Sequence, residues 1–187
     1  QNLGIQFTGL WANSKEVAYA TTPENEQLRW FLDTTIIFRK KFSATLSYQP
    51  RLFTKQKLKI EWQYYRINKS VLDKLQPDFF ASPDGKMSYP VISYNITKDT
   101  RNIQPHPTKG YVFNFLIEKQ GINNIRDALI TLIDFRYFQR LSAKWTATQQ
   151  LRHQNNWINK ATDYVHNRAL GDELNDIRGY EYYIIDA

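Results

Sequence analysis

Long stretches of this chain alternate strictly between apolar and polar side chains, and this alternation restricts the fold more than any other feature. It is cleanest in residues 57–68, with Leu58, Ile60, Trp62 and Tyr64 on one face and Lys59, Glu61 and Gln63 on the other. Residues 42–53 repeat it, with Phe42, Ala44, Leu46, Tyr48 and Leu52 against Ser43, Thr45, Ser47, Gln49 and Arg51. Because successive side chains of a strand point to opposite faces, both segments are predicted to be β-strands with one apolar and one polar face.

Six further segments show the same pattern, and together with the first two they predict about eight strands. They are residues 2–12, 28–39, 89–99, 110–119, 126–139 and 144–155. The segments are roughly 10–14 residues long, whereas strands of soluble proteins usually have about five or six residues and a tilted strand that crosses a bilayer needs about 9–11. The predicted fold is therefore all-β, an antiparallel transmembrane β-barrel, and the alternative is a soluble lipocalin-like barrel or a large sandwich.

Hydropathy and aromatic content agree with strands that cross a membrane. No apolar run approaches the roughly 18 residues of a membrane helix. The mean hydropathy is −0.59, and a value this low is compatible with barrel strands, which expose an apolar side chain to lipid only at every second residue. Aromatic residues make up 15% of the chain. Rings near strand ends are expected to form girdles at the depth of the lipid headgroups. The candidates are Trp11, Trp30, Tyr64, Tyr65, Tyr89, Tyr111, Tyr137, Trp145 and Trp157.

The predicted connections differ in length from one end of the strands to the other. Residues 54–57 and 140–143 are expected to be tight turns, and residues 69–88 and 156–187 long loops. Short turns on one side and long loops on the other are typical of outer-membrane barrels. The connection 13–27 does not fit, because counting strands places this long segment on the side of the short turns.

Catalytic, metal and cofactor sites are not indicated. The chain has no cysteine, which excludes disulfides and thiolate ligands. His106, His153 and His166 are far apart, with no further ligand at metal spacing. There is no nucleophile elbow and no glycine-rich loop that could hold a phosphate. We therefore expect no metal, no cofactor and no enzymatic activity.

The charges are expected to be structural. The net charge of +7 is distributed along the whole sequence rather than in a patch, so a nucleic-acid partner is not expected. Asp99 and Asp134 are expected to pair with Arg101 and Arg136 rather than to act as a pair of catalytic acids.

Two short motifs carry a family resemblance. In the first, a strand ends in Asp99-Thr100-Arg101, and Pro107-Thr108-Lys109-Gly110 opens the next strand after a few residues. The second is Ile177-Arg178-Gly179-Tyr180. Both resemble motifs of the BamA/TamA superfamily of outer-membrane assembly factors, where the second reads Val-Arg-Gly-Phe/Tyr. They occur in the family's order with three strand-like segments between them. A weaker similarity is the aromatic-x-x-Pro ending of residues 46–53, and the resemblance covers about residues 40–187.

The resemblance implies that residues 1–187 form part of a single outer-membrane β-barrel domain, with 156–187 as a long loop. Family barrels have sixteen strands and further strands after the Arg-Gly-Tyr loop, so we expect the chain to be part of a longer polypeptide. In the family this loop folds into the lumen, where its arginine, here Arg178, pairs with acidic groups of the inner wall. Gly179 would let the backbone turn tightly beside it.

For the first motif, the resemblance is supported by the chemistry of its residues. Asp99 and Arg101 can fix the exit from a strand as a charge pair. Pro107 restricts the backbone beside Thr108 and donates no hydrogen bond. Gly110 can adopt a positive φ where the next strand begins.

The function that the resemblance implies is the insertion, assembly or translocation of other outer-membrane proteins. It needs no covalent chemistry, because an incoming strand pairs with an exposed strand edge. The implied partners are outer-membrane lipid, lipopolysaccharide, unfolded outer-membrane client proteins and accessory lipoproteins. Two alternatives remain open: a passive outer-membrane porin or receptor barrel, and a soluble β-barrel binding module.

Overall fold

The computed structural model describes residues 2–22, 27–75, 82, 84–122, 126–158, 168–170 and 185–186. Over these residues the chain is all-β, with one short helix. The strands are β1 (Asn2–Ser14), β2 (Glu16–Thr21), β3 (Gln27–Phe31), β4 (Ile37–Arg51), β5 (Thr54–Ile67), β6 (Lys86–Asp99), β7 (Gly110–Gln120), β8 (Ala128–Arg140), β9 (Thr146–Ile158), β10 (Arg168–Leu170) and β11 (Ile185–Asp186). The helix is α1 (Lys69–Lys74), which is too short to cross a membrane.

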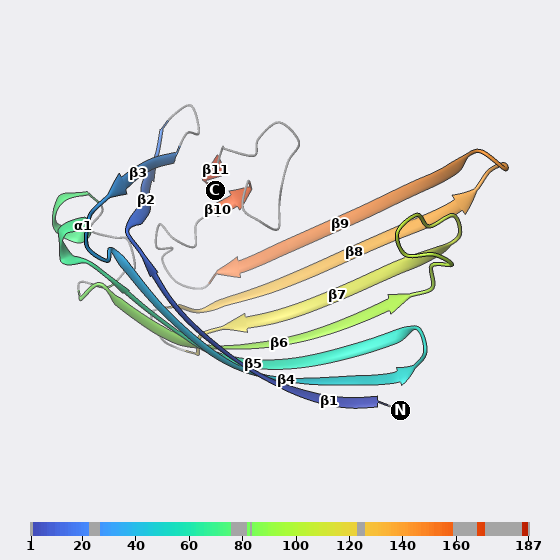
Figure 1. Ribbon diagram of the computed structural model, residues 1–187, viewed down its shortest axis with the longest axis horizontal. Helices are drawn as coiled ribbons and strands as arrows, with labels where there is room; N and C mark the ends of the chain where they lie inside the picture. The colour runs from blue at the N-terminus through green and yellow to red at the C-terminus, as the bar shows by residue number, and fades with distance from the viewer. Residues whose placement is uncertain are drawn as a thin grey trace. The chain divides into compact units, whose positions relative to one another are not determined.

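Seven long strands form one sheet in the order β1-β4-β5-β6-β7-β8-β9 (Figure 1). Two small antiparallel sheets, β2-β3 and β10-β11, complete the described strands. Strands β6 to β9 pair antiparallel without a register shift, from Val91 opposite Gln120 to Arg140 opposite Thr146. In this order β1 and β9 are the end strands, and the described residues of one do not pair with those of the other.

The two faces of the long strands differ in chemistry. Cross-strand partners and ring contacts assign each side chain to a face, because directly opposed residues of an antiparallel pair point to the same side. We call one side the apolar face, which carries Leu3, Ile5, Phe7, Phe42, Leu46, Leu58, Ile60, Trp62, Ile92, Tyr94, Phe113, Phe115, Ile117, Ile133, Phe135, Tyr137, Leu151 and Trp157. We call the other the polar face, which carries Lys57, Lys59, Glu61, Gln63, Ser93, Asn95, Thr97, Asp99, Asn114, Glu118, Asp134, Arg136, Gln150 and Arg152.

On β5, β6 and β8 the polar face is more buried than the apolar face, which is the reverse of the exposure in a protein whose surface meets water. On the apolar face Phe7 is 79% exposed and Ile60 is 55% exposed. On the polar face Glu61 and Asp134 are each only 8% exposed. Large exposed apolar areas normally mark a surface that contacts another apolar phase or partner. The alternation predicted for residues 57–68 is confirmed, and so is the mixed pattern in β8, where Ile130 and Leu132 lie on the polar face.

The expected single strand over residues 28–39 is wrong. Strand β3 ends at Phe31, the polar residues 33–35 follow, and β4 starts only at Ile37. Ile36 is buried, and its backbone N–H donates to Ser14 O at 2.8 Å, which returns the chain to β1. Strands β2 and β3 form a hairpin inside the connection from β1 to β4, with a register shift between Ala18 and Ala20.

This hairpin explains why the connection 13–27 did not fit the expected alternation of short turns and long loops. The segment 15–36 is one long connection from β1 to β4. Its end lies beside the start of the other long connection, 68–85, because the Asn68 N–H donates to Ile36 O at 2.8 Å. The tight turns expected at 54–57 and 140–143 are shifted, because β5 begins three residues earlier than predicted and β9 begins two residues later. They lie at 52–53 and 141–145.

The described residues group into two compact units. The first contains residues up to Thr8, Phe42–Trp62 and Pro90 onward through β9, and the second contains Gly9–Lys41 and Gln63–Tyr89. Most of the buried apolar side chains are in the second unit, where they include Val17, Ile36, Ile67, Val71, Leu72, Met87 and Tyr89. Tyr89 is 2% exposed and stacks on Tyr65 at 6.4 Å. The prediction that Tyr65 and Tyr89 belong to a girdle that faces lipid is therefore wrong, because both rings pack on the polar side.

Candidate functional site

The connection between β6 and β7, residues 100–109, contains the predicted strand-turn motif and is held by a charge pair. Arg101 binds Asp99 with both ends of its guanidinium: Nε donates to Oδ1 at 2.9 Å, and Nη2 donates to Oδ2 at 2.6 Å. The backbone N–H of Arg101 also donates to Asp99 Oδ1 at 3.1 Å. These bonds with Asp99 raise the pKa of the Arg101 guanidinium above its ordinary value. The predicted pairing of Asp99 with Arg101 is confirmed, in the planar fork geometry that arginine offers to a carboxylate.

Asn102 organises the rest of this connection, and sequence reasoning did not find it. Its Oδ1 accepts from the backbone N–H groups of Thr108 and Lys109, both at 3.1 Å, and its Nδ2 donates to Thr108 Oγ1 at 2.9 Å. An asparagine that satisfies nearby backbone donors is a common turn device. The sequence feature that could have identified Asn102 is an asparagine in a predicted connection between two strands. Pro107 stands within the segment that Asn102 closes, where a missing N–H costs no ladder hydrogen bond.

Gly110 allows β7 to begin directly against the strand end of β6. Its φ is +105°, a conformation that favours glycine. A Cβ at this position would overlap the Thr100 carbonyl oxygen and lie 2.8 Å from its carbon. The Thr100 N–H donates to Tyr111 O at 2.9 Å, and the Tyr111 N–H donates to Thr100 Oγ1 at 3.0 Å. The predicted positive φ at Gly110 is confirmed, and close backbone approach is its cause.

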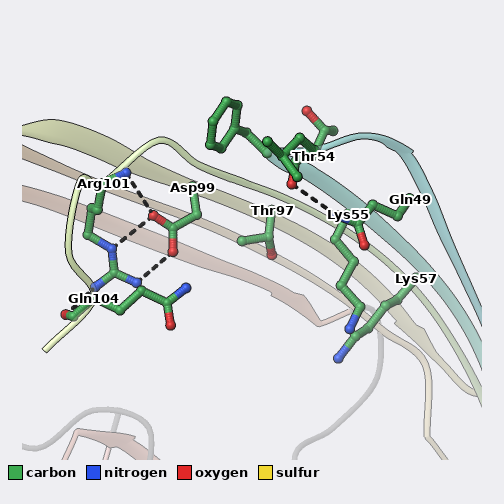
Figure 2. A pocket seen from close by; sticks show the side chains of 10 residues that line it. Gln49, Thr54, Lys55, Lys57, Thr97, Asp99, Arg101 and Gln104 are labelled. Carbon is green, nitrogen blue, oxygen red and sulfur yellow. Dashed lines mark hydrogen bonds and ion pairs between the residues drawn. The ribbon is translucent and has the colours of Figure 1, made fainter. Parts of the chain in front are cut away.

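The same motif forms one wall of a pocket of about 600 Å³ in the first unit (Figure 2). It is lined by Gln49, Leu52, Phe53, Thr54, Lys55, Lys57, Thr97, Asp99, Arg101 and Gln104. The Asp99 N–H donates to Phe53 O at 2.9 Å and so joins the β6 end to the β4–β5 turn. Figure 2 shows Lys55 and Lys57 extending from β5 in the same direction. The pocket is therefore polar and cationic on the β5 side, while Arg101 is neutralised by Asp99.

On the polar face the charged and amide side chains form contacts with one another. Asn95 Nδ2 donates to Asn114 Oδ1 at 2.8 Å across β6 and β7. Asp134 accepts from Arg136 Nη2 at 3.0 Å and from Gln150 Nε2 at 3.1 Å, which confirms the predicted pairing of Asp134 with Arg136. Buried polar groups need such partners to offset the loss of water. The arrangement can contact water or another polar surface, and among the described residues of the polar face no nucleophile lies beside a general base.

Ile177, Arg178, Gly179 and Tyr180 lie outside the described residues, so the predicted position of Arg178 in a lumen stays a prediction. Within the part of the chain that the structure describes, no three His, Cys, Asp or Glu side chains gather where they could hold a metal ion.

A scan against protein-family models and a search of curated proteins found no match to this chain.

Proposed function

We propose that the long strands form part of the wall of a transmembrane β-barrel in a bacterial outer membrane. The observation that carries this proposal is the reversed exposure of β5, β6 and β8, where the apolar face is open and polar-face side chains such as Glu61 and Asp134 are buried. A side chain such as Ile60 loses little by facing lipid, and water in a lumen can solvate polar groups that the lipid cannot. Strands β4 to β9, with 11–15 residues each, are long enough to cross when tilted.

The two shortest and the two longest connections between the long strands support one orientation. Outer-membrane barrels have short periplasmic turns and longer extracellular loops. The two-residue turn at 52–53 and the segment 141–145 would face the periplasm, and the segments 15–36 and 68–85 would face the outside. The end strands β1 and β9 need further strands beside them, because lipid cannot satisfy unpaired backbone groups. A sixteen-stranded barrel of the BamA/TamA type would supply them.

Within that class we propose insertion, assembly or translocation of other outer-membrane proteins, without covalent chemistry. The support is the motif from Asp99 to Gly110, where the charge pair, the turn and the positive φ combine as the resemblance implies. The proposed partners are outer-membrane lipid, lipopolysaccharide, unfolded outer-membrane proteins and accessory lipoproteins.

The experiment is reconstitution of the full-length protein into lipid vesicles. A denatured outer-membrane porin is then added, and its folding is followed by heat-modifiable migration on gels. We expect faster folding than in empty vesicles, and we expect the protein to stay in the vesicles after a urea wash. Retention without faster folding, together with solute flux through the vesicles, would favour a passive porin. Release by the wash would contradict a transmembrane wall and favour a soluble module.

A further inference from the structure

At the end of the apolar face in the second unit, two cations stand among aromatic rings. They are Lys40 of β4 and Arg66 of β5. Lys40 Nζ lies 4.5 Å from the centroid of the Trp11 ring and 5.0 Å from that of Phe38. The Arg66 guanidinium carbon lies 5.5 Å from the Phe38 centroid, and Phe38 meets Tyr64 edge-on at 6.3 Å. We call these five residues the cationic ring cluster.

Neither cation has a carboxylate partner among the described residues. Elsewhere in the same unit Arg29 does pair with a carboxylate, that of Glu16, at 3.0 Å. Lys40 and Arg66 contact ring faces instead, which attract a cation but leave its hydrogen-bond donors free. A Lys and an Arg that share a surface with aromatic rings would repel each other unless an anion lies between or beside them.

Beside Arg66 the structure provides a small hollow of about 230 Å³. It is lined by Thr35, Ile36, Phe38, Arg66, Ile67 and Asn68. Thr35 is exposed and carries a hydroxyl, and Arg66 is exposed and carries a fork of donors. Guanidinium and hydroxyl donors beside an apolar wall suit a phosphate ester that is attached to a hydrocarbon body.

The cluster lies where the strands lead into the long connections. Lys40 is close to the start of β4, after the segment 15–36, and Arg66 is next to the last residue of β5, before the segment 68–85. Under the orientation proposed above this end lies at the outer leaflet, where aromatic and cationic side chains meet the lipid headgroups.

We propose that the cationic ring cluster binds the phosphate groups of an anionic membrane lipid, at this end the phosphates of lipopolysaccharide. The inference rests on the proposed membrane orientation and adds a specific lipid site to it. Trp11 and Phe38 position the two cations, Arg66 and Thr35 contact one phosphate group, and Lys40 contributes charge beside it. Cations at a membrane surface interact with anionic lipids in this way.

The test uses the full-length protein in neutral detergent micelles. Lipid A is titrated in, and the midpoint of thermal unfolding is measured. We expect a saturable rise of the midpoint for the wild type. For the double variant Lys40→Gln with Arg66→Gln the lipid A concentration at half-saturation should rise roughly 30-fold, because each cation near an anionic surface contributes about fivefold. The matched control is Arg140→Gln with Lys144→Gln, which removes the same charge from exposed side chains at the β8–β9 connection and should titrate like the wild type.

Three results with the variants or with inorganic phosphate would overturn the site. One is an equal response of the double variant and the wild type, and another is equal weakening in the control variant, which would mean that only net charge matters. The third is the same saturable rise with inorganic phosphate alone, because this would indicate a site for a soluble anion. Retention of the wild type in neutral vesicles after a urea wash, without any effect of lipid A, would overturn the lipid site and leave the proposed barrel intact. Loss of the wild type from vesicles would overturn both.

Discussion

Gly110 shows how closely the backbone of β7 approaches the end of β6. Its φ of +105° lies outside the range that L residues normally adopt, and the Thr100 carbonyl occupies the position of a Cβ. The first motif therefore depends on a residue without a side chain as much as on its charge pair. An alanine at this position could fit only if the connection moved.

We predict that Gly110→Ala destabilises the protein by about 1–3 kcal/mol, the usual cost of a strained backbone conformation. The measurement is the unfolding free energy in detergent, from urea titration. Gly4→Ala is the matched control, because a Cβ at Gly4 of β1 meets nothing within 4 Å. If both alanine variants have the same stability, the backbone approach at Thr100 does not constrain the fold.

The fork between Asp99 and Arg101 predicts a coupling that depends on geometry. In a double-mutant cycle with Asp99→Asn and Arg101→Lys, we expect a coupling free energy of about 1 kcal/mol, since charged hydrogen bonds are strong but this pair is partly exposed to water. Arg101→Lys keeps the charge and the backbone donor and loses the planar fork. Strict additivity of the two changes would show that the charge alone holds the turn.

Among the elements, β5 shows the difference between the two faces most clearly. Ile60 on its apolar face is 55% exposed, whereas Glu61 on its polar face is 8% exposed and pairs with Lys59 at 2.5 Å. In a water-soluble protein an exposed isoleucine can be replaced at little cost. In a strand that faces lipid, replacement of such an isoleucine by a charged residue destabilises the protein strongly.

Ile60→Arg should therefore cost about 2–4 kcal/mol in lipid if the residue lies near the bilayer midplane. Folding free energy in vesicles is the measurement. Leu52→Arg in the β4–β5 turn serves as control, because Leu52 is 79% exposed and lies outside the strands. Its change should stay within about 0.5 kcal/mol. Equal, small changes at both positions would indicate that the apolar face of β5 meets water.

Strand type was predictable from the sequence wherever one face was uniformly apolar. The ends of β5 and β7 lie within three residues of their predicted positions, because alternation is a local property of side chains. The segment from 28 to 39 was not predictable in this way. Its apolar residues keep the same spacing on both sides of the polar residues 33–35, and the hydrogen bonds to Lys15 O and Ser14 O show that the chain bends there.

The candidate site was predictable to a different extent. The roles of Asp99, Arg101 and Gly110 follow from their residue types at strand ends, so the sequence alone was sufficient to predict the charge pair and the positive φ. Asn102 acts through three hydrogen bonds whose geometry arises only when 108–109 folds back toward it. The cationic ring cluster combines side chains from β1, β4 and β5. Strands β1 and β4 are neighbours only because β2 and β3, which lie between them in the sequence, form a separate sheet.

For the whole molecule, the sheet order makes a prediction that cysteine cross-linking can check, and the chain contains no cysteine of its own. Cysteines at Thr131 and Asn155, which are opposed in β8 and β9, should form a disulfide under mild oxidation. Cysteines at Ile5 of β1 and Leu151 of β9 should not, since β1 and β9 end the sheet order. Non-reducing gels give the measurement.

The control for cross-linking is the offset pair Thr131 and Gln154, whose side chains point to opposite faces. It should stay reduced. A disulfide between Ile5→Cys and Leu151→Cys within one chain would contradict the open sheet order and indicate a closed seven-stranded sheet.

The unbroken register from β6 to β9 limits how this protein can change length during evolution. Insertion of one residue in β8 before Asp134 would move every later side chain of that strand to the other face, so that Asp134 and Arg136 would lie on the apolar face. Insertion of two residues would keep each side chain on its face and only lengthen the strand. Homologous sequences should therefore differ in strand length by even numbers, and odd insertions should be confined to the connections or accompanied by a bulge.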